Sequence, residues 1–300
     1  MKSSSSKKFI LGLIIIMVVF IYNSYINNQE KQKGEIKNVV KVNSNLNETL
    51  KIYYIDVGQA DSSLISYNDK YILIDAGNEE DGEKLVEYFK KLSIEKFDYV
   101  FATHPHEDHI GGMDDIISNF KIDNFLMPNV LTTTKTFENM LNALEKNNLG
   151  YKVPKINNEY NIDNLNIKVL YIDDNSKDLN DDSIVLKLTF GKDSFLFMGD
   201  ASKKVEKNIL NSDIKSDVLK VGHHGSSYSS SSEFVDKVNP KYAMISVGLN
   251  NKYNHPTQSV IDLFNKKNIL IYRTDKDGTI ILDCDGENIN IKKEVTETNG

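Results

Sequence analysis

The sequence contains one cysteine, no tryptophan and no excess of basic residues. The single cysteine, Cys284, excludes an internal disulfide, and we interpret it as a small buried hydrophobic residue. The net charge of −7 does not favour tight, non-specific binding to nucleic acid, which normally requires a basic surface. It does not exclude a polyanionic substrate, because bound metal ions reverse the local field. No short tandem repeat is visible, which argues against a solenoid.

One long hydrophobic run is present, close to the N-terminus. Lys2, Lys7 and Lys8 precede an apolar run over residues 9–26, and the pattern resembles a signal sequence. The run is close to the ~20 residues that span a bilayer. The absence of a small-x-small cleavage pattern after it favours an uncleaved anchor over a cleaved signal, and the lysines predict that the body lies outside the cytoplasm. The alternative, a buried core helix, does not fit the polar flanks, so we assign residues 1–28 as a signal-anchor or transmembrane segment.

The rest of the chain divides into a polar stretch and a long patterned region. Residues 29–49 are rich in Asn, Gln, Lys and Glu and predict a flexible linker. Apolar periodicity predicts strands over 51–57, 62–66, 71–75, 99–103, 122–127, 167–171, 183–190, 194–198, 218–221, 242–247, 269–273, 278–284 and 288–293. Helices are expected over 82–92, 113–119, 137–147, 233–238 and 257–267, with another after the turn at 199–200. These elements fall into two halves of the chain, each with several strands and then helices. This pattern suggests two sheets packed face to face, with helices outside.

The stretch His104–His109 contains three of the six histidines and two carboxylates. A hydrophobic run over residues 99–103 leads into it and two glycines lead out, so we expect a loop at the end of a buried strand. Neutral imidazole and carboxylate are the usual ligands of a zinc-like ion. The first two histidines alternate with other residues and can point the same way, while Asp108 and the last histidine can serve a second ion. A surface loop that is rich in histidine by chance is the alternative, and the density of ligand types argues against it.

Other expected strand ends also carry acids or imidazoles. These candidates are Asp75, Asp200, the pair His223 and His224, and His255. One end of the sheets can gather them around the histidine-rich loop, and a carboxylate between two ions can bridge them. We expect Asp200 to be this bridge. A turn-forming or helix-capping aspartate and a structural histidine pair are the alternatives.

Taken together, these residues resemble a known family. Asp75, His104-x-His106-x-Asp108-His109, Asp200 and His223 follow the order of the metallo-β-lactamase superfamily signature. The finer details resemble its ComEC-type branch, the hydrolase-like domain of bacterial competence proteins. The stretches that carry this likeness are Asp56–Ser62, Phe197–Asp200, Lys220–Ser226, Ile245–Gly248, Tyr253–Pro256, and Arg273–Asp275 with Gly278. The resemblance covers roughly residues 50 to 285. It implies an α/β (α+β) fold, a four-layer αββα sandwich, for a hydrolase domain over residues 50–295.

The resemblance also implies roles for these residues. His104 and His106 would bind a first divalent ion, and Asp200 would bridge it to a second. Asp108, His109 and either His223 or His224 would bind the second ion, while Asp75 would hold the histidine-rich loop by hydrogen bonds. We expect Asp108, His224 and His255 to take part in catalysis.

One departure from the wider superfamily concerns the first ion. A third histidine normally completes its ligands, but no histidine lies between His109 and His223. The chain has Asn180-Asp181-Asp182-Ser183 in this region, so an oxygen from Asn180 or Asp182, or water, would take the place. More oxygen ligands shift the preference from zinc toward manganese. We expect two divalent ions, with zinc as the first choice.

The expected reaction is hydrolysis by water that the ions activate. Phosphodiesters are the preferred substrates, because relatives are thought to degrade a nucleic-acid strand and others cleave phosphocholine esters. The single hydrophobic run cannot form the membrane channel of the full competence protein, so we expect a stand-alone extracytoplasmic version, membrane-anchored or secreted. A lactone or β-lactam hydrolase and a non-enzymatic binding module are the alternatives. We interpret the serine-rich stretch 226–232 as a mobile surface loop and helix cap.

Overall fold

Two mixed β-sheets lie at the centre of the protein. The computed structural model describes residues 49–174 and 176–294. The expected anchor over residues 1–28 and the expected linker over 29–49, apart from Thr49, lie outside the described residues. Within the described part, no helix is both long enough and apolar enough to cross a bilayer.

The first sheet has eight strands in the order β17-β16-β1-β2-β3-β5-β7-β8. Its strands are β1 (Leu50–Tyr54), β2 (Ser63–Tyr67), β3 (Lys70–Ile74), β5 (Tyr99–Phe101), β7 (Phe125–Leu126), β8 (Tyr151–Lys152), β16 (Thr279–Cys284) and β17 (Ile289–Glu294). The pairs from β17 to β3 are antiparallel, and those from β3 to β8 are parallel. The chain therefore starts this sheet with β1 and returns at its end to place β16 beside it.

The second sheet has seven strands in the order β15-β14-β13-β12-β11-β10-β9. Its strands are β9 (Glu159–Ile162), β10 (Leu165–Tyr171), β11 (Val185–Phe190), β12 (Asp193–Phe197), β13 (Val218–Lys220), β14 (Tyr242–Ile245) and β15 (Leu270–Arg273). Its last four strands, β12 to β15, run parallel, so their carboxyl ends share one edge. A separate pair joins β4 (Lys96–Phe97) to β6 (Lys121–Ile122).

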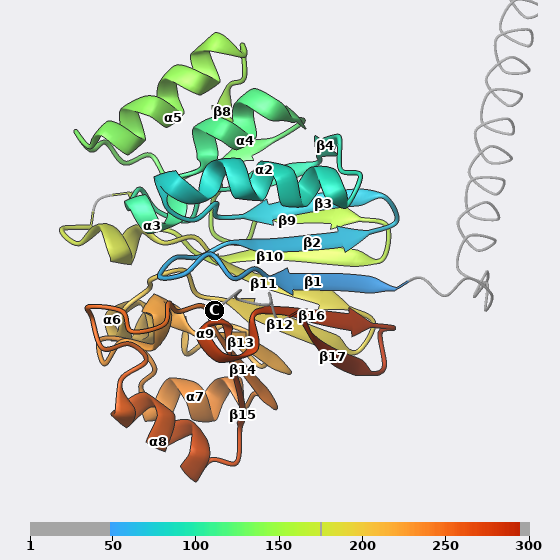
Figure 1. Ribbon diagram of the computed structural model, residues 1–300. Coiled ribbons are helices and arrows are strands. Elements are labelled where there is room, and N and C mark those ends of the chain that lie inside the picture. Colours follow the sequence, from blue (N-terminus) through green and yellow to red (C-terminus); the bar gives the residue numbers. More distant parts are fainter. Residues whose placement is uncertain (1–48, 175, 295–300) are drawn as a thin grey trace, which may run out of the picture. The chain divides into compact units, whose positions relative to one another are not determined.

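Helices cover the outer face of each sheet (Figure 1). On the first sheet lie α2 (Gly82–Lys91), α4 (Met113–Asn119) and α5 (Lys135–Lys146), and on the second α6 (Lys203–Ile209), α7 (Ser232–Val238) and α8 (Gln258–Lys266). Short helical turns complete the chain: α3 (Glu107–Ile110), α9 (Thr274–Asp277), η1 (Glu79–Asp81), η2 (Leu179–Asp182) and η3 (Gly222–Gly225).

Three apolar layers hold these four layers together. Strand β1 contributes to two of these layers, because successive side chains of a strand point to opposite faces of the sheet. Tyr53 packs toward the helices of its own sheet, while Ile52 and Tyr54 pack between the two sheets. Cys284 is buried in this middle layer, as expected. The third layer joins the second sheet to α6, α7 and α8. The predicted four-layer αββα sandwich is confirmed.

Two local predictions were wrong. The apolar run over residues 122–127 is not one strand: it divides between β6 and β7, which belong to different sheets. The serine-rich stretch 226–232 is only partly at the surface, although Tyr228 within it is exposed. Ser226 and Ser229 are buried, and the buried Glu206 carboxylate of α6 accepts the main-chain N–H groups of Ser230 and Ser231. The expected helix cap is present, since the Ser231 side chain caps α7.

Candidate metal centre

The histidine-rich loop leaves the carboxyl end of β5 and contains the short helix α3. Its main chain packs tightly on the turn that follows β3. The Ala76 N–H donates to the His109 carbonyl at 2.8 Å, and the Gly111 N–H donates to the Gly77 carbonyl at 2.8 Å. A Cβ atom on Gly111 would lie 2.1 Å from the main-chain carbon of Asn78, so only glycine permits this approach. The glycines that follow the histidines are therefore needed to seat the loop.

A third loop, between β1 and β2, joins the same network. The Asp61 N–H donates to the Asp108 carbonyl, and the Gly77 N–H donates to the Asp61 carbonyl, both at 2.9 Å. Thr103 donates to Asp75 with its N–H and its hydroxyl, each at 2.8 Å. Hydrogen bonds thus fix the histidine-rich loop to the two neighbouring loops, after β1 and after β3, before any cation is considered.

The remaining candidates come from the second sheet. Asp200 follows β12, and its N–H donates to the Ser183 hydroxyl at 3.1 Å. The turn η3 follows β13, and its N-terminal part is tied to Asp200's loop by the His223 N–H, which donates to the Gly199 carbonyl at 3.0 Å. His223 and His224 both have left-handed backbone angles, with φ values of 51° and 52°. Such angles cost about 1–2 kcal/mol each for non-glycine residues, so the surrounding packing must hold them.

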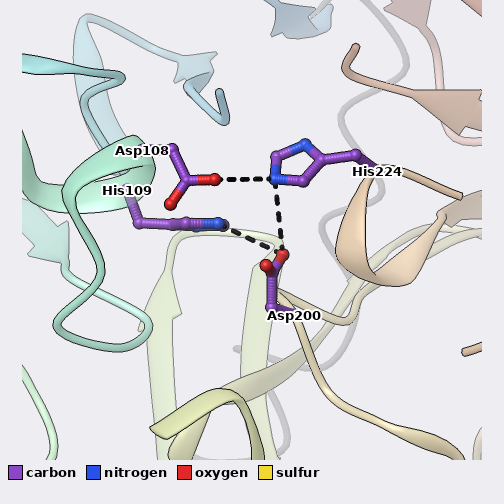
Figure 2. A group of neighbouring side chains, drawn as sticks. All are labelled: Asp108, His109, Asp200 and His224. Atoms are coloured by element: carbon purple, nitrogen blue, oxygen red, sulfur yellow. Dashed lines mark ion pairs between the residues drawn. The ribbon is translucent and has the colours of Figure 1, made fainter. Parts of the chain in front are cut away.

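Asp200 and three other side chains form a compact cluster around the Asp200 oxygen Oδ1. His109 Nε2 lies 3.1 Å and His224 Nε2 3.7 Å from Asp200 Oδ1, and His224 Nε2 lies 3.2 Å from Asp108 Oδ2. Figure 2 shows Asp108 and His109 approaching from α3, His224 from the opposite side, and Asp200 below, with its carboxylate toward the rings. One ligand atom from each residue lies within 4.8 Å of the others. We call these residues the four-residue group.

The other oxygen of Asp200 faces a second set of imidazoles. His223 Nε2 lies 3.6 Å and His104 Nε2 4.0 Å from Oδ2. His104 Nε2 is in turn 3.0 Å from His106 Nδ1. The structure therefore places His224, and not His223, in the four-residue group, while His223 lies on the side of the histidines that were expected to bind the first ion.

The hydrogen bonds of the rings indicate which nitrogen is free. His224 Nδ1 donates to the Ser246 carbonyl at 2.9 Å, and His109 Nδ1 donates to Asp75 at 2.8 Å. In the neutral rings, the lone pair of each Nε2 then faces carboxylate oxygens. Among the described residues, His109 Nε2, His224 Nε2 and Asp200 Oδ1 are buried atoms that make no hydrogen bond. A divalent cation would satisfy all three, so the residues fit the metal that the fold implies.

Charge across the group agrees with this fit. Burial raises the pKa of Asp200, but His109 and His224 outweigh burial and hold the pKa well below its usual range. Burial likewise opposes the charge on His224, yet Asp200 and Asp61 raise its pKa to about 10. Without a cation the rings therefore tend to take up protons, and a cation that binds here must displace them.

The other expected residues lie at varying distances from this centre. Asn180 lines the cavity beside it, and its buried Oδ1 makes no hydrogen bond. Asp182 is not among the described residues that line the cavity, and its Oδ1 accepts the Ser176 N–H at 3.2 Å. The ring of His255 lies 5.6 Å from that of His223, centroid to centroid. Asn180 and His255 thus line the cavity over the centre, whereas Asp182 does not.

Two contributors were missed at the sequence level. Asp61 and Lys220 are both buried, and Lys220 Nζ lies 2.6 Å from Asp61 Oδ2. Asp61 Oδ1 lies 3.3 Å from His224 Nδ1. Both residues stand inside stretches that carried the family resemblance, Asp56–Ser62 and Lys220–Ser226. That position was a signal, but a lone acid and a lone lysine suggest no pairing before the sheets are assembled.

A cavity of about 1170 Å³ opens over the centre. Its wall includes Asp108, Asp200, His223 and His224 at one end, and it extends past the loop after β1 to helix α2. Lysines and tyrosines also line it: Lys84, Lys91, Lys252, Tyr88 and Tyr253. A cavity of this size holds a drug-sized molecule or a short piece of a polymer.

Comparisons with known proteins agree with the geometry. A family model described as the metallo-beta-lactamase superfamily matches residues 55–248. ComE operon protein 3 of Bacillus subtilis (strain 168) is 33% identical over 249 residues, which are 75% of this chain and 32% of that protein. Competence protein ComA of Neisseria gonorrhoeae is 28% identical over 233 residues, 75% of this chain and 31% of that protein. The chain thus spans about a third of the length of these relatives.

A solved structure gives the same fold. The metallo-beta-lactamase fold protein YhfI from Bacillus subtilis superposes with a TM-score of 0.57 at 11% identity, covering 79% of this chain and 100% of that one. From the matched family model, the sandwich of two sheets and the cluster of histidines and aspartates at their edge, we conclude that this chain belongs to the metallo-β-lactamase superfamily and is a hydrolase, with competence proteins among its relatives.

Proposed function

We propose that this protein is an extracytoplasmic, metal-dependent phosphodiesterase. The observation that carries the proposal is the position of Asp200: it lies buried at the wall of a large cavity, with imidazole nitrogens beside both of its oxygens. A carboxylate in this position can hold two cations side by side, an arrangement suited to displacement at phosphorus. We propose zinc as the first choice for these cations and manganese as the second.

Bound cations would polarise the scissile bond and lower the pKa of water. Asp108, His109, Asp200 and His224 would hold one cation. His104, His106 and His223, with the other Asp200 oxygen, would hold the second. Asn180 lines the same cavity, and we propose that it adds an oxygen. The main-chain network fixes the histidine-rich loop, which keeps the reacting groups in place.

His255 is the residue best placed to contact the leaving group. It lines the cavity, and its Nδ1 is buried without a hydrogen bond. Burial, with His223 and His224 nearby, lowers the pKa of His255 to about 4. The ring is therefore neutral at pH 7, so we propose that it orients the leaving oxygen through a hydrogen bond and does not deliver a full proton.

The relatives favour a phosphodiester over other bonds. Two of them are named for competence, and Recombination protein 2 of Haemophilus influenzae is 27% identical over 258 residues. Such names point to the handling of nucleic acid, whose backbone is a phosphodiester. Lys84, Lys91 and Lys252 on the cavity wall supply positive charge for a phosphate chain. Carboxylates such as Glu80, Glu107 and Glu294 line the same wall, so we propose that the cations provide most of the attraction.

The location is proposed from the sequence of the N-terminus. The lysines before the apolar run of residues 9–26 favour a body outside the cytoplasm, tethered through residues 1–28 or secreted. A phosphoester or nucleic-acid-like substrate at the cell surface would suit that location.

Turnover of three substrates tests the function. Metal-loaded protein is incubated with bis-p-nitrophenyl phosphate, with single-stranded DNA and with nitrocefin. We expect turnover of the two phosphodiesters, and a loss of at least about 100-fold in Asp200→Ala, because this change removes a ligand that both cations would share. Asp213→Ala is the control, since Asp213 is exposed and pairs with Lys187 at 2.8 Å. Turnover of nitrocefin alone would replace the proposal with an amide hydrolase, and no turnover on any substrate would favour a binding module.

A further inference from the structure

A buried ion pair lies directly behind the four-residue group. Asp61 and Lys220 expose only 6% and 3% of their side chains, and their charged atoms are 2.6 Å apart. The two residues come from different sheets: Asp61 lies in the loop after β1, and Lys220 ends β13. The ammonium also contacts the Val221 carbonyl, at a longer distance of 3.4 Å. The proposed reaction makes no use of this pair.

Asp61 contacts two members of the four-residue group, His224 and Asp108, which also lie close to each other. Its Oδ1 lies 3.3 Å from His224 Nδ1, on the side of the ring opposite to the free Nε2. Its N–H donates to the Asp108 carbonyl at 2.9 Å. One residue therefore supports the His224 ring and the main chain of Asp108, which belong to different halves of the molecule.

The charges of the pair have separate effects. His224 Nδ1 donates its hydrogen bond to the Ser246 carbonyl, so Asp61 acts on the ring through its charge. A carboxylate this close to Nδ1 increases the electron density at Nε2, and losing an outer partner of a ligand histidine usually costs 10–100-fold in metal affinity. A buried carboxylate, in turn, requires an opposite charge or full hydrogen bonding. Asp61 Oδ1 makes no hydrogen bond, so Lys220 supplies this compensation.

We propose that Asp61 and Lys220 are a positioning pair that fixes His224 and strengthens the binding of the cation held by the four-residue group. Lys220 allows the Asp61 carboxylate to be buried at this place, and the Asp61 charge beside Nδ1 orients the His224 ring and makes it a stronger ligand. The proposal concerns one of two cation positions and does not depend on which bond the enzyme cleaves.

Cobalt(II) binding to the full-length chain tests the proposal. Co²⁺ is the probe because its visible spectrum reports the ligands, and competition with a chelator gives the dissociation constant of each equivalent. We expect Asp61→Asn to weaken one equivalent by about 10- to 100-fold, to change its spectrum and to leave the other equivalent unchanged. Lys187→Met is the matched control, since Lys187 is a similarly buried lysine with its own partner, Asp213. It should leave both constants unchanged.

The double variant Asp61→Asn/Lys220→Met keeps the test valid if a single change prevents folding. It removes both charges, so no uncompensated ion stays buried, and we expect it to fold and still to bind one equivalent 10- to 100-fold more weakly. Wild-type constants in either Asp61 variant would overturn the proposal, as would equal weakening of both equivalents or a wild-type protein that binds no Co²⁺.

Discussion

Asp200 separates the histidines of the site into two sets. Its Oδ1 faces His109 and His224, while its Oδ2 faces His104 and His223. Each oxygen thus meets one imidazole from each half of the chain. The adjacent histidines serve different oxygens, and both have left-handed backbone angles in η3.

Replacing the two adjacent histidines should therefore have different consequences. We expect His224→Gln to weaken cation binding at the four-residue group by at least about tenfold, because Nε2 is one of its buried, unbonded atoms. His223→Gln should leave that position occupied, since His223 is 24% exposed and faces the other oxygen. Metal per chain after dialysis measures the difference. Equal loss of bound metal from both variants would contradict the assignment of the two histidines to different oxygens of Asp200.

Asp182 gives a pH prediction that does not involve a ligand. Desolvation by burial, with Asp173 nearby, raises the pKa of this carboxyl to about 6. A raised pKa in the folded state favours folding below the unfolded pKa of about 3.9, and this contribution is lost as the pH rises through 6. Asp182→Asn keeps the acceptor for the Ser176 N–H and removes the charge.

The comparison of Asp182→Asn with wild type isolates this group. We expect the free energy of unfolding of the variant, relative to wild type, to be about 1 kcal/mol higher at pH 7.5 than at pH 4.5, the full linkage value being reduced for solvent screening. Urea unfolding of metal-free protein at both pH values measures it. A difference that is the same at both pH values would show that Asp182 ionises normally.

The elements that carry the ligands depend on close main-chain approach. Gly111→Ala would place a Cβ atom 2.1 Å from Asn78 carbon and 2.3 Å from Glu79 nitrogen, both main-chain atoms that cannot move aside cheaply. We expect a loss of about 1–3 kcal/mol in stability and weaker cation binding, because α3 must shift. Gly150→Ala is the control, since nothing lies within 4 Å of its Cβ position. Urea unfolding and metal titration test both, and an unchanged Gly111→Ala variant would show that the loop is not held this way.

Local patterns predicted most elements but not their partners. The apolar spacing of residues 82–92 and 137–147 gave helices close to α2 and α5. The run over 122–127 looked continuous, yet it divides because Ile122 and Phe125 pair with different strands. Periodicity measures which face is apolar, and it does not measure which neighbour covers that face. For the same reason the partial burial of the serine-rich stretch was not predicted: Glu206, which accepts the Ser230 N–H, lies 24 positions away in the sequence.

At the scale of the whole molecule, the predicted ligands met because strand ends share an edge. Acids and imidazoles after β3, β5, β12 and β13 were visible in the sequence, and parallel strands bring such residues together. The return of β16 and β17 to the first sheet was not predicted. It depends on pairing Leu50 with Cys284, a contact across more than two hundred residues that leaves no local pattern. The Asp61–Lys220 pair was hidden for the same reason.

The four-residue group takes Asp108 and His109 from one half of the sandwich and Asp200 and His224 from the other. A cation held there should therefore link the two sheets and stabilise the fold. At a free concentration of about 1,000 times its dissociation constant, a ligand adds about 4 kcal/mol, which corresponds to roughly 10 °C for a domain of this size. We expect chelation to lower the melting temperature by about this amount and readdition of metal to restore it. In Asp200→Ala both responses should largely disappear, whereas Asp213→Ala should respond like wild type. A wild-type melting temperature that does not change on chelation would mean that the folded protein holds no cation under these conditions, and that the apolar layers alone hold the two halves together.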